Sequence, residues 1–395
     1  MKDHLVSFDD TETAFLSKSD RELKRAYWLF KLISFNWLVR LSPPFVQFAL
    51  WAKLPVKGLI RATAFKHFCG GENIVSCSET IQKLSEYHIG TILDYSVEGK
   101  ESEEDFELGL KETLSTVARA KGDKNIPFCV FKPTGFARFS LLEKKNAGVL
   151  LNKEEEKEFD SFKKRIEKIC QASFDAKVPV FIDAEESWIQ DVIDETATAM
   201  MMKFNKVNPI VFNTLQMYRT GRMEYLKKCI QHAKDNNYIP GFKIVRGAYM
   251  EKERLRAAKL NEPSPIQVDK ASTDNDYNAA LKLIINNIDA VALCCGTHNE
   301  SSTLLLIELM ESNKISNNHK HIWFSQLFGM SDHISYNLAN KGYNVSKYVP
   351  YGPVEAVLPY LIRRAQENTS VAGQTSRELS LLREELKRRN ENKKS

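Results

Sequence analysis

Two adjacent arginines near the C-terminal end of the chain are candidates for binding an anion. Arg363 and Arg364 are neighbours on a predicted helix, where consecutive side chains point about 100° apart, so both guanidinium groups could approach one carboxylate. Glu367, four residues after Arg363, could hold that guanidinium in place. An Arg-Arg pair alone is more typical of a surface helix with salt bridges, so the anion site depends on the residues that accompany the pair.

Further polar side chains follow a series of short apolar segments. In chain order, the ends of these segments carry Asp94, Lys132, Asp183, Glu185, Gln216, Arg246, Tyr249, Thr297, His298, Asn299, Gln326 and Tyr348. The set combines cations, carboxylates that can pair with them and two tyrosines. Such a set suits a small ligand that carries a carboxylate.

Two of these side chains have more than one interpretation. Lys132 could be a Schiff-base nucleophile, a ligand for a carboxylate or a buried partner of Asp183, and the residues alone do not separate the three. His298 could bind a metal, but the other histidines, His319 and His321 among them, have no zinc-site spacing. We therefore predict no metal site.

The apolar segments predict the fold that brings these residues together. Their hydrophobic residues are nearly continuous, as in parallel strands buried on both faces, and the polar segments between them are long enough for crossover helices. The eight segments cover residues 91–97, 128–134, 178–185, 210–216, 242–248, 289–298, 321–329 and 345–352. An open nucleotide-binding sheet would usually carry G-x-G-x-x-G, which the sequence lacks. We predict an α/β fold, a (βα)8 TIM-like barrel whose active site lies at the C-terminal ends of its strands.

We predict that residues 1–85 form a helical extension before the barrel. Helical periodicity runs over residues 21–39, and a second amphipathic helix is predicted over 45–67, interrupted near Pro55. The aromatic and basic residues of 27–60 could let one helix face lie on a membrane, beside the plainer interpretation that they cover a core. Charged residues interrupt every apolar run well before the roughly 20 residues that span a bilayer, so no transmembrane helix is predicted.

The rest of the chain divides into the barrel and a tail. The predicted barrel domain occupies residues 86–372. Residues 373–395 are charged and helix-prone, and we predict a solvated terminal helix that frays.

Composition limits the partners and the compartment. The net charge of +5 is small beside 56 basic and 51 acidic side chains, so nucleic acid is not predicted as a partner. Seven cysteines without a C-x-x-C pair fit a reducing compartment. The first residues are acidic, unlike a signal or transit peptide, so we expect a cytoplasmic protein, peripheral on the inner membrane face, or a mitochondrial matrix location in a eukaryote.

Five separated motifs resemble those of the proline dehydrogenase family, of the single-function type. They are IDAEE at 182–186, VRGAY at 245–249, THN at 297–299, YVPYG at 348–352 and YLIRRAQEN at 360–368. Their order and spacing also match, from about residue 85 to 372. The resemblance implies a distorted (βα)8 barrel that holds FAD at the strand C-termini without a Rossmann motif.

The resemblance also implies the residues that bind the substrate. Arg363 and Arg364 would grip the carboxylate of L-proline with help from Lys132, and Glu367 would orient the guanidinium pair. Tyr348 would pack over the pyrrolidine ring and contact Asp183, and Tyr249 and Tyr360 would shape the pocket.

For the cofactor, the resemblance implies FAD contacts from Gln216, Arg246, Gly247, Ala248, Thr297, His298 and Asn299. Two positions depart from the bifunctional bacterial relatives. Lys243 stands where those proteins have an arginine directed at flavin N5, so here the hydrogen bond toward N5 would come from an ammonium. Of their Thr-Arg-Lys run for the FAD phosphates and ribose only Lys270 has a counterpart, in Val268-Asp269-Lys270.

The implied activity is oxidation of L-proline to Δ1-pyrroline-5-carboxylate, the first step of proline catabolism to glutamate, with electrons passed to a membrane quinone. Two alternatives have distinct signatures. A Schiff-base lyase or aldolase that uses Lys132 would be trapped by borohydride with a carbonyl substrate. An inactive, membrane-associated scaffold would float with liposomes and show no turnover.

Overall fold

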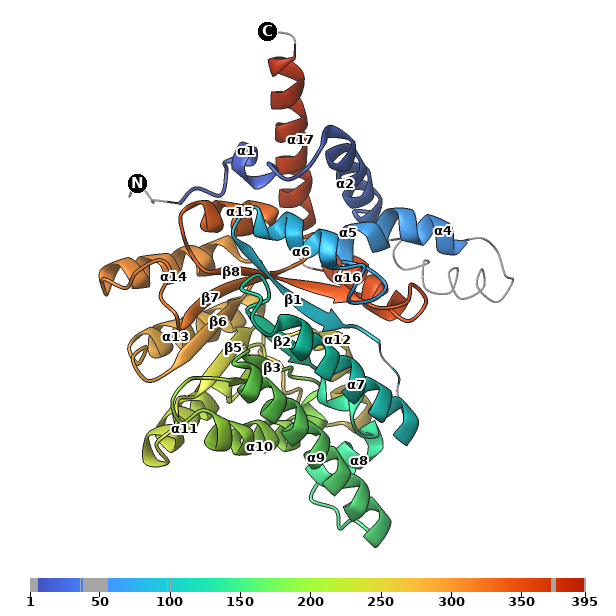
Figure 1. Cartoon of the computed structure of the whole chain (residues 1–395), viewed down its shortest axis with the longest axis vertical. Helices are drawn as coiled ribbons and strands as arrows, with labels where there is room; N and C mark the ends of the chain where they lie inside the picture. Colours follow the sequence, from blue (N-terminus) through green and yellow to red (C-terminus); the bar gives the residue numbers. More distant parts are fainter. Residues whose placement is uncertain are drawn as a thin grey trace. The chain divides into compact units, whose positions relative to one another are not determined.

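The computed structural model describes residues 6–35, 37, 56–97, 99, 101–370 and 374–393, with the backbone alone for 56, 366–370 and 374–375. Within these residues, eight parallel strands close into a barrel in sequence order (Figure 1). The strands are β1 (Ile89–Tyr95), β2 (Phe128–Phe131), β3 (Val180–Ile182), β4 (Val211–Gln216), β5 (Gly241–Val245), β6 (Ala292–Gly296), β7 (Ile322–Leu327) and β8 (Val345–Tyr351). The predicted (βα)8 TIM-like barrel is confirmed.

Helices alternate with the strands, as the polar segments predicted. They are α7 (Glu103–Ala120), α8 (Phe139–Asn146), α9 (Lys153–Ala176), α10 (Ser187–Phe204), α11 (Arg222–Asp235), α12 (Met250–Leu260), α13 (Lys270–Ile285), α14 (Glu300–Ser312) and α15 (Asp332–Asn340). Side-chain caps explain where several of them begin. Asp269 accepts the amide of Ser272 at the start of α13, and Asn299 accepts the amide of Ser302 at the start of α14.

Several predicted strands are longer than the observed ones. The apolar segment 178–185 contains a strand of three residues, Val180–Ile182, and 289–298 contains Ala292–Gly296. The physical reason is that an apolar pattern reports burial, whereas a strand ends where its hydrogen-bonded pairing ends. Residues 184–186 remain buried although they have left the sheet.

An aromatic layer fills the barrel interior near the N-terminal ends of the strands. The rings of Phe128, Phe181, Phe212 and Trp323 contact one another, with 4.5 Å between the centroids of the first two. Because side chains alternate along a strand, residues two positions further on point into the same interior. Polar residues therefore face inward at the C-terminal ends of β3 and β4.

By compactness the chain divides into two units, residues 1–98 with 326–395 and residues 99–325. The first unit contains α16 (Leu358–Ser370), which follows β8. It also adds helices that are not part of the strand-helix alternation: α1 (Thr11–Ala14), α2 (Asp20–Ile33), α4 (Val56–Ile60), a π-helical turn (Arg61–Phe65), α5 (Lys66–Phe68), α6 (Ser78–Ser85) and α17 (Gln374–Asn392). Among the described residues, no helix is long and apolar enough to cross a bilayer.

The terminal helices differ in detail from the sequence prediction. The helix predicted over 21–39 ends at Ile33. The described part of the predicted 45–67 helix is helical throughout, from Val56 to Phe68, with a π-helical turn at Arg61–Phe65. Residues 36 and 38–55 lie outside the described residues. The prediction that the tail is a solvated, fraying helix was wrong, because Leu381, Leu382 and Glu385 of α17 are buried and α17 packs on α2.

Candidate active site

An ion pair joins the residue that follows β3 to the middle of β5. The Lys243 ammonium bonds to the carboxylate of Asp183, and the two side chains are 7% and 14% exposed. The same ammonium lies 5.4 Å from the centroid of the Phe181 ring. The structure thus brings together two predicted site residues, and it shows that Lys243 is a partner of Asp183, a role that the sequence had suggested for Lys132.

Two buried oxygens lie nearby on β4. The side-chain oxygens Oγ1 of Thr214 and Oε1 of Gln216 are buried without a hydrogen-bond partner among the described residues. An unsatisfied buried polar atom costs free energy unless a ligand or water completes it. Gln216 was predicted to contact the cofactor, and Thr214 was missed although the two-residue period of the strand places it on the same face.

Arg246 is the centre of a polar network after β5. Its Nε lies 2.7 Å from Asp274 on α13, its Nη1 2.8 Å from Thr297 and its Nη2 2.9 Å from Ser302 on α14. Lys270 bonds to the other carboxylate oxygen of Asp274. The network therefore joins three predicted residues, Arg246, Thr297 and Lys270, through two that were missed.

The carboxylate of Asp274 balances the two cations. Burial alone would raise the pKa of Asp274, but the hydrogen bonds from Lys270 and Arg246 outweigh it and lower the pKa below its usual value. Asp274 lies four residues after Lys270 on one helix, and this spacing is the sequence signal that could have identified it.

The backbone that follows Arg246 requires glycine. Gly247 has φ +132°, and a Cβ atom there would lie 2.4 Å from the ring of Tyr218. Ala248 is exposed, and Tyr249 precedes the first turn of α12. His298 and Asn299 follow β6, where Asn299 caps α14. These residues form an accessible edge of backbone and side chains at the strand C-termini.

Lys132 follows β2 and precedes a short turn that is fixed by Glu185. The carboxylate of Glu185 accepts hydrogen bonds from the amide of Thr134 at 2.9 Å and from its hydroxyl at 2.5 Å. Burial raises the pKa of Glu185 to about 7, against the effect of these hydrogen bonds. Glu185 thus connects the turn after Lys132 to the segment that begins with Asp183.

The remaining predicted residues lie on β8 and α16. Tyr348 and Tyr360 are buried, and the Arg364 guanidinium carbon lies 5.4 Å from the centroid of the Tyr360 ring. Arg363 is half-buried. The side chain of Glu367 lies outside the described residues. Among the described residues, no group of three histidine, cysteine or acidic side chains could hold a metal ion.

Comparisons with known proteins agree on one family. The family model described as proline dehydrogenase matches residues 77–377. Proline dehydrogenase 1, mitochondrial, of Dictyostelium discoideum is 34% identical over an alignment that covers 96% of this chain and 74% of the relative. The carbapenem antibiotics biosynthesis protein CarD of Pectobacterium carotovorum subsp. carotovorum is 33% identical over 82% of this chain and 83% of its own. Hydroxyproline dehydrogenase of Xenopus laevis is 29% identical over an alignment that covers 97% of this chain and 90% of the relative.

A solved structure supports the fold. Proline utilization A (PutA) from Bdellovibrio bacteriovorus, inactivated by N-propargylglycine, superposes with a TM-score of 0.71 at 19% identity, over 91% of this chain and 38% of that chain. This chain therefore spans about two fifths of that protein, and the similarity shows the fold. The family match and the relatives above 30% identity support an oxidoreductase that acts on proline in proline catabolism. The family model covers most of the sequence and a relative above 30% identity covers nearly all of it, so the resemblance of the motifs is confirmed and the chain belongs to the proline dehydrogenase family.

Proposed function

We propose that this protein oxidises L-proline to Δ1-pyrroline-5-carboxylate with FAD as its cofactor and a membrane quinone as the electron acceptor. The observation that carries the proposal is the placement of three predicted site residues. Asp183, Gln216 and Arg246 each lie at the C-terminal end of a barrel strand, where (βα)8 enzymes bind their ligands.

The residues at these strand ends fit a flavin nucleotide. The buried Oε1 of Gln216 and Oγ1 of Thr214 are polar atoms that the edge of a flavin ring can satisfy. Arg246 and Lys270 supply cationic donors of the kind that bind phosphates. Gly247, Ala248, Thr297, His298 and Asn299 complete the proposed contacts.

The proposed substrate site binds the carboxylate of proline through Arg363 and Arg364, with Lys132 as a further cation and Glu367 holding the guanidinium pair. Tyr348 packs over the pyrrolidine ring, while Tyr249 and Tyr360 limit the pocket. The arginines neutralise the carboxylate and orient the ring, which lowers the entropic part of the barrier. Lys243 and Asp183 form a buried ion pair, so their charges are already fixed in place before the reaction begins. Fixed charges do not have to reorient, as water would, when charge develops on the substrate.

The reaction requires proline with its amine deprotonated. A hydride leaves C5 while the nitrogen lone pair forms the C=N bond, and the nitrogen then loses its remaining proton to give Δ1-pyrroline-5-carboxylate. The chemistry supplied by FAD is acceptance of this hydride and delivery of the two electrons to a quinone. The protein contributes position, charge and exclusion of water.

An anaerobic absorbance spectrum tests cofactor and substrate together. We expect the purified protein to show a flavin band at about 450 nm that bleaches on addition of L-proline. Tetrahydrofuran-2-carboxylate, which keeps the ring and carboxylate but has no amine to oxidise, serves as the control and should leave the flavin oxidised. A colourless protein, or a flavin indifferent to proline, contradicts the proposal and favours the Lys132 lyase or the inactive scaffold.

We propose that α2 contributes to a peripheral membrane contact within residues 27–60. The face of α2 opposite its buried residues exposes Trp28 and Leu32, which are 57% and 54% exposed, followed by Phe35. Lys31 lies beside them, with its ammonium 4.7 Å from the centroid of the Trp28 ring. Aromatic and aliphatic side chains mixed with a base suit the interface of an anionic bilayer. Such a contact would place the protein on the inner membrane face, in the mitochondrial matrix if the source is eukaryotic.

Liposome flotation tests this surface. The double variant Trp28→Glu/Leu32→Glu should bind vesicles of phosphatidylcholine and phosphatidylglycerol at least about tenfold more weakly, because it replaces apolar side chains by charges of the same sign as the lipid. The matched control Leu150→Glu/Val207→Glu changes two exposed side chains of residues 99–325. Equal flotation of wild type and the Trp28/Leu32 variant contradicts the assignment.

A further inference from the structure

The helix that carries Arg363 and Arg364 packs on a hydrophobic core outside the strand-helix alternation. This core, called the terminal core below, is formed by buried residues of α1, α2, α5, α16, α17 and the segments beside them: Ala14, Phe15, Leu23, Ala26, Phe30, Ile33, Phe65, Phe68, Cys69, Met330, Val354, Val357, Tyr360, Leu361, Leu381 and Leu382. Helix α16 contacts both α2 and α17. The position of the two arginines therefore depends on helices from both ends of the chain.

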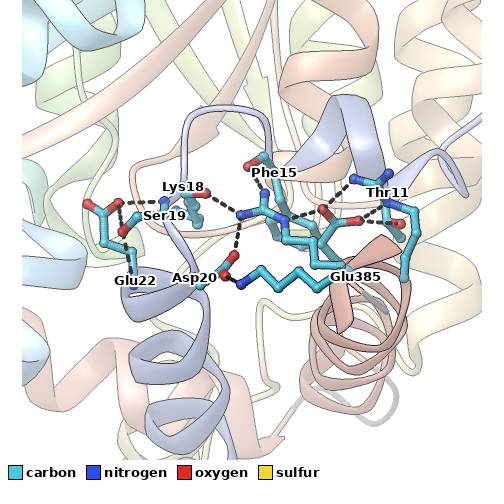
Figure 2. Close-up of polar contacts among 10 residues, drawn as sticks. Thr11, Phe15, Lys18, Ser19, Asp20, Glu22 and Glu385 are labelled. Carbon is cyan, nitrogen blue, oxygen red and sulfur yellow. Dashed lines mark hydrogen bonds and ion pairs between the residues drawn. The ribbon is translucent and has the colours of Figure 1, made fainter. Parts of the chain in front are cut away.

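A buried carboxylate on α17 joins that helix to the N-terminal segment (Figure 2). Glu385 is fully buried, and its Oε2 accepts a hydrogen bond from the hydroxyl of Thr11 at 3.0 Å. The Glu385 carboxylate also accepts hydrogen bonds from Nε of Arg388 at 2.8 Å and from Nε of Arg389 at 2.7 Å. Burial alone would raise the pKa of Glu385, but the hydrogen bonds from Arg388, Arg389 and Thr11 outweigh it and lower the pKa.

Arg389 extends this contact to the loop between α1 and α2. Its Nη2 donates to the carbonyl of Phe15 at 2.9 Å, and its Nη1 donates to the carbonyl of Lys18 at 2.8 Å and to Asp20 at 3.0 Å. Figure 2 shows Phe15, Lys18 and Asp20 gathered on one side of Glu385. Because the Phe15 side chain belongs to the terminal core, the polar contact and the apolar packing hold the same segment.

We propose that the pair Glu385 and Arg389 positions α16, and through it the arginines that bind the substrate carboxylate. A buried ion pair is a weak source of stability compared with apolar residues of similar volume, but it fixes one arrangement of the groups that it joins. Both members of this pair lie on α17, four residues apart, and both also bond to the segment from Thr11 to Asp20. These bonds hold α17 against the start of α2, and α16 contacts both helices. The inference rests on the proposed function, since it assumes that Arg363 and Arg364 bind proline.

The consequence is a specific kinetic pattern. A binding group that is displaced by a fraction of an ångström loses affinity, so loosening α17 should weaken proline binding. The proposed flavin contacts come from residues 99–325 and do not involve the terminal core. Flavin content and the rate at saturating proline should therefore change little. A merely structural role would instead lower the amount of folded, flavin-loaded enzyme without changing its KM.

The test compares Arg389→Met with Arg383→Met, which removes an exposed arginine from the same helix. For Arg389→Met we expect KM for L-proline and the Kd of tetrahydrofuran-2-carboxylate to rise about tenfold, with kcat per bound flavin within about twofold. Arg389→Lys should recover part of the affinity, and Arg383→Met should match wild type. Glu385→Gln keeps the side-chain shape and gives the same readout where Arg389→Met does not fold.

Two outcomes overturn the inference. One is unchanged KM and Kd in both Arg389→Met and Glu385→Gln, and the other is a fall in kcat per flavin at constant KM. Arg363→Met separates this result from failure of the proposed function. If Arg363→Met loses the analogue but Arg389→Met keeps it, only the positioning role is wrong. If Arg363→Met also binds the analogue normally, the carboxylate assignment itself is wrong.

Discussion

Replacing Arg363 with methionine is expected to raise the KM for L-proline by about two orders of magnitude, because the variant loses a charge-assisted contact with the carboxylate worth about 2–3 kcal/mol. Methionine keeps the length and the apolar stem of arginine but has no charge or donor. Arg363 is a cleaner position for this test than Arg364, because Arg363 is half-buried and Arg364 is buried against Tyr360. Steady-state kinetics with the flavin content measured for each preparation give the result.

Two controls tie the effect to the carboxylate. Arg363→Lys keeps the charge without the planar fork and should recover part of the affinity. Prolinamide, whose ring is the same but whose carboxylate is neutralised, should bind wild type and Arg363→Met about equally. A KM for proline that stays within twofold of wild type in Arg363→Met excludes this arginine as the carboxylate ligand.

The barrel could be predicted because its strands are buried on both faces. Such strands appear as continuous apolar runs, and the polar residues that end the runs, such as Asp183 and Gln216, were identified with them. The ends of the strands could not be predicted as well. Residues 184–186 stay buried through contacts from other segments, such as the Thr134 bonds to Glu185, and a sequence pattern does not contain those contacts.

The partners of the site residues were the larger omission. Ser302 and Asp274 lie tens of residues after Arg246 and meet it only in the fold, and Lys243 proved to be a partner of Asp183. The terminal helix α17 was misjudged for the same reason. Its many charges suggest a solvated helix, but Glu385 and Arg389 find partners near the other end of the chain, at Thr11 and Phe15.

A second large effect is expected at a buried ion cluster on the outer side of β8. The carboxylate of Asp332 lies 2.8 Å from the ammonium of Lys347 and 2.9 Å from that of Lys18. Lys347 is fully buried and is the neighbour of Tyr348 on the strand. In Asp332→Asn this buried lysine loses its counter-charge, and we expect the free energy of unfolding to fall by about 3–5 kcal/mol, a large fraction of the stability of an ordinary domain.

The dependence of this effect on pH gives an independent check. Burial alone would raise the pKa of Asp332, but Lys18 and Lys347 outweigh it and hold the pKa well below the usual value of 3.8. A carboxyl group whose pKa is lower in the folded state stabilises the fold above its unfolded pKa and loses that contribution as the pH falls. Urea unfolding of wild type should therefore show a loss of stability below about pH 4 that is smaller in Asp332→Asn.

The double variant Asp332→Asn/Lys347→Met distinguishes the charge from the shape of the cluster. Methionine fills most of the volume of the lysine and needs no counter-ion, so the double variant should recover much of the stability that Asp332→Asn loses. Two results would show that the ion pair does not stabilise the fold at β8. One is a free energy of unfolding for Asp332→Asn within about 1 kcal/mol of wild type, and the other is a double variant as unstable as Asp332→Asn alone. A KM for proline that is raised in the double variant, although its stability has recovered, would indicate that Lys347 fixes the position of its neighbour Tyr348. The two side chains leave the strand on opposite faces, so Lys347 would act through the position of the strand.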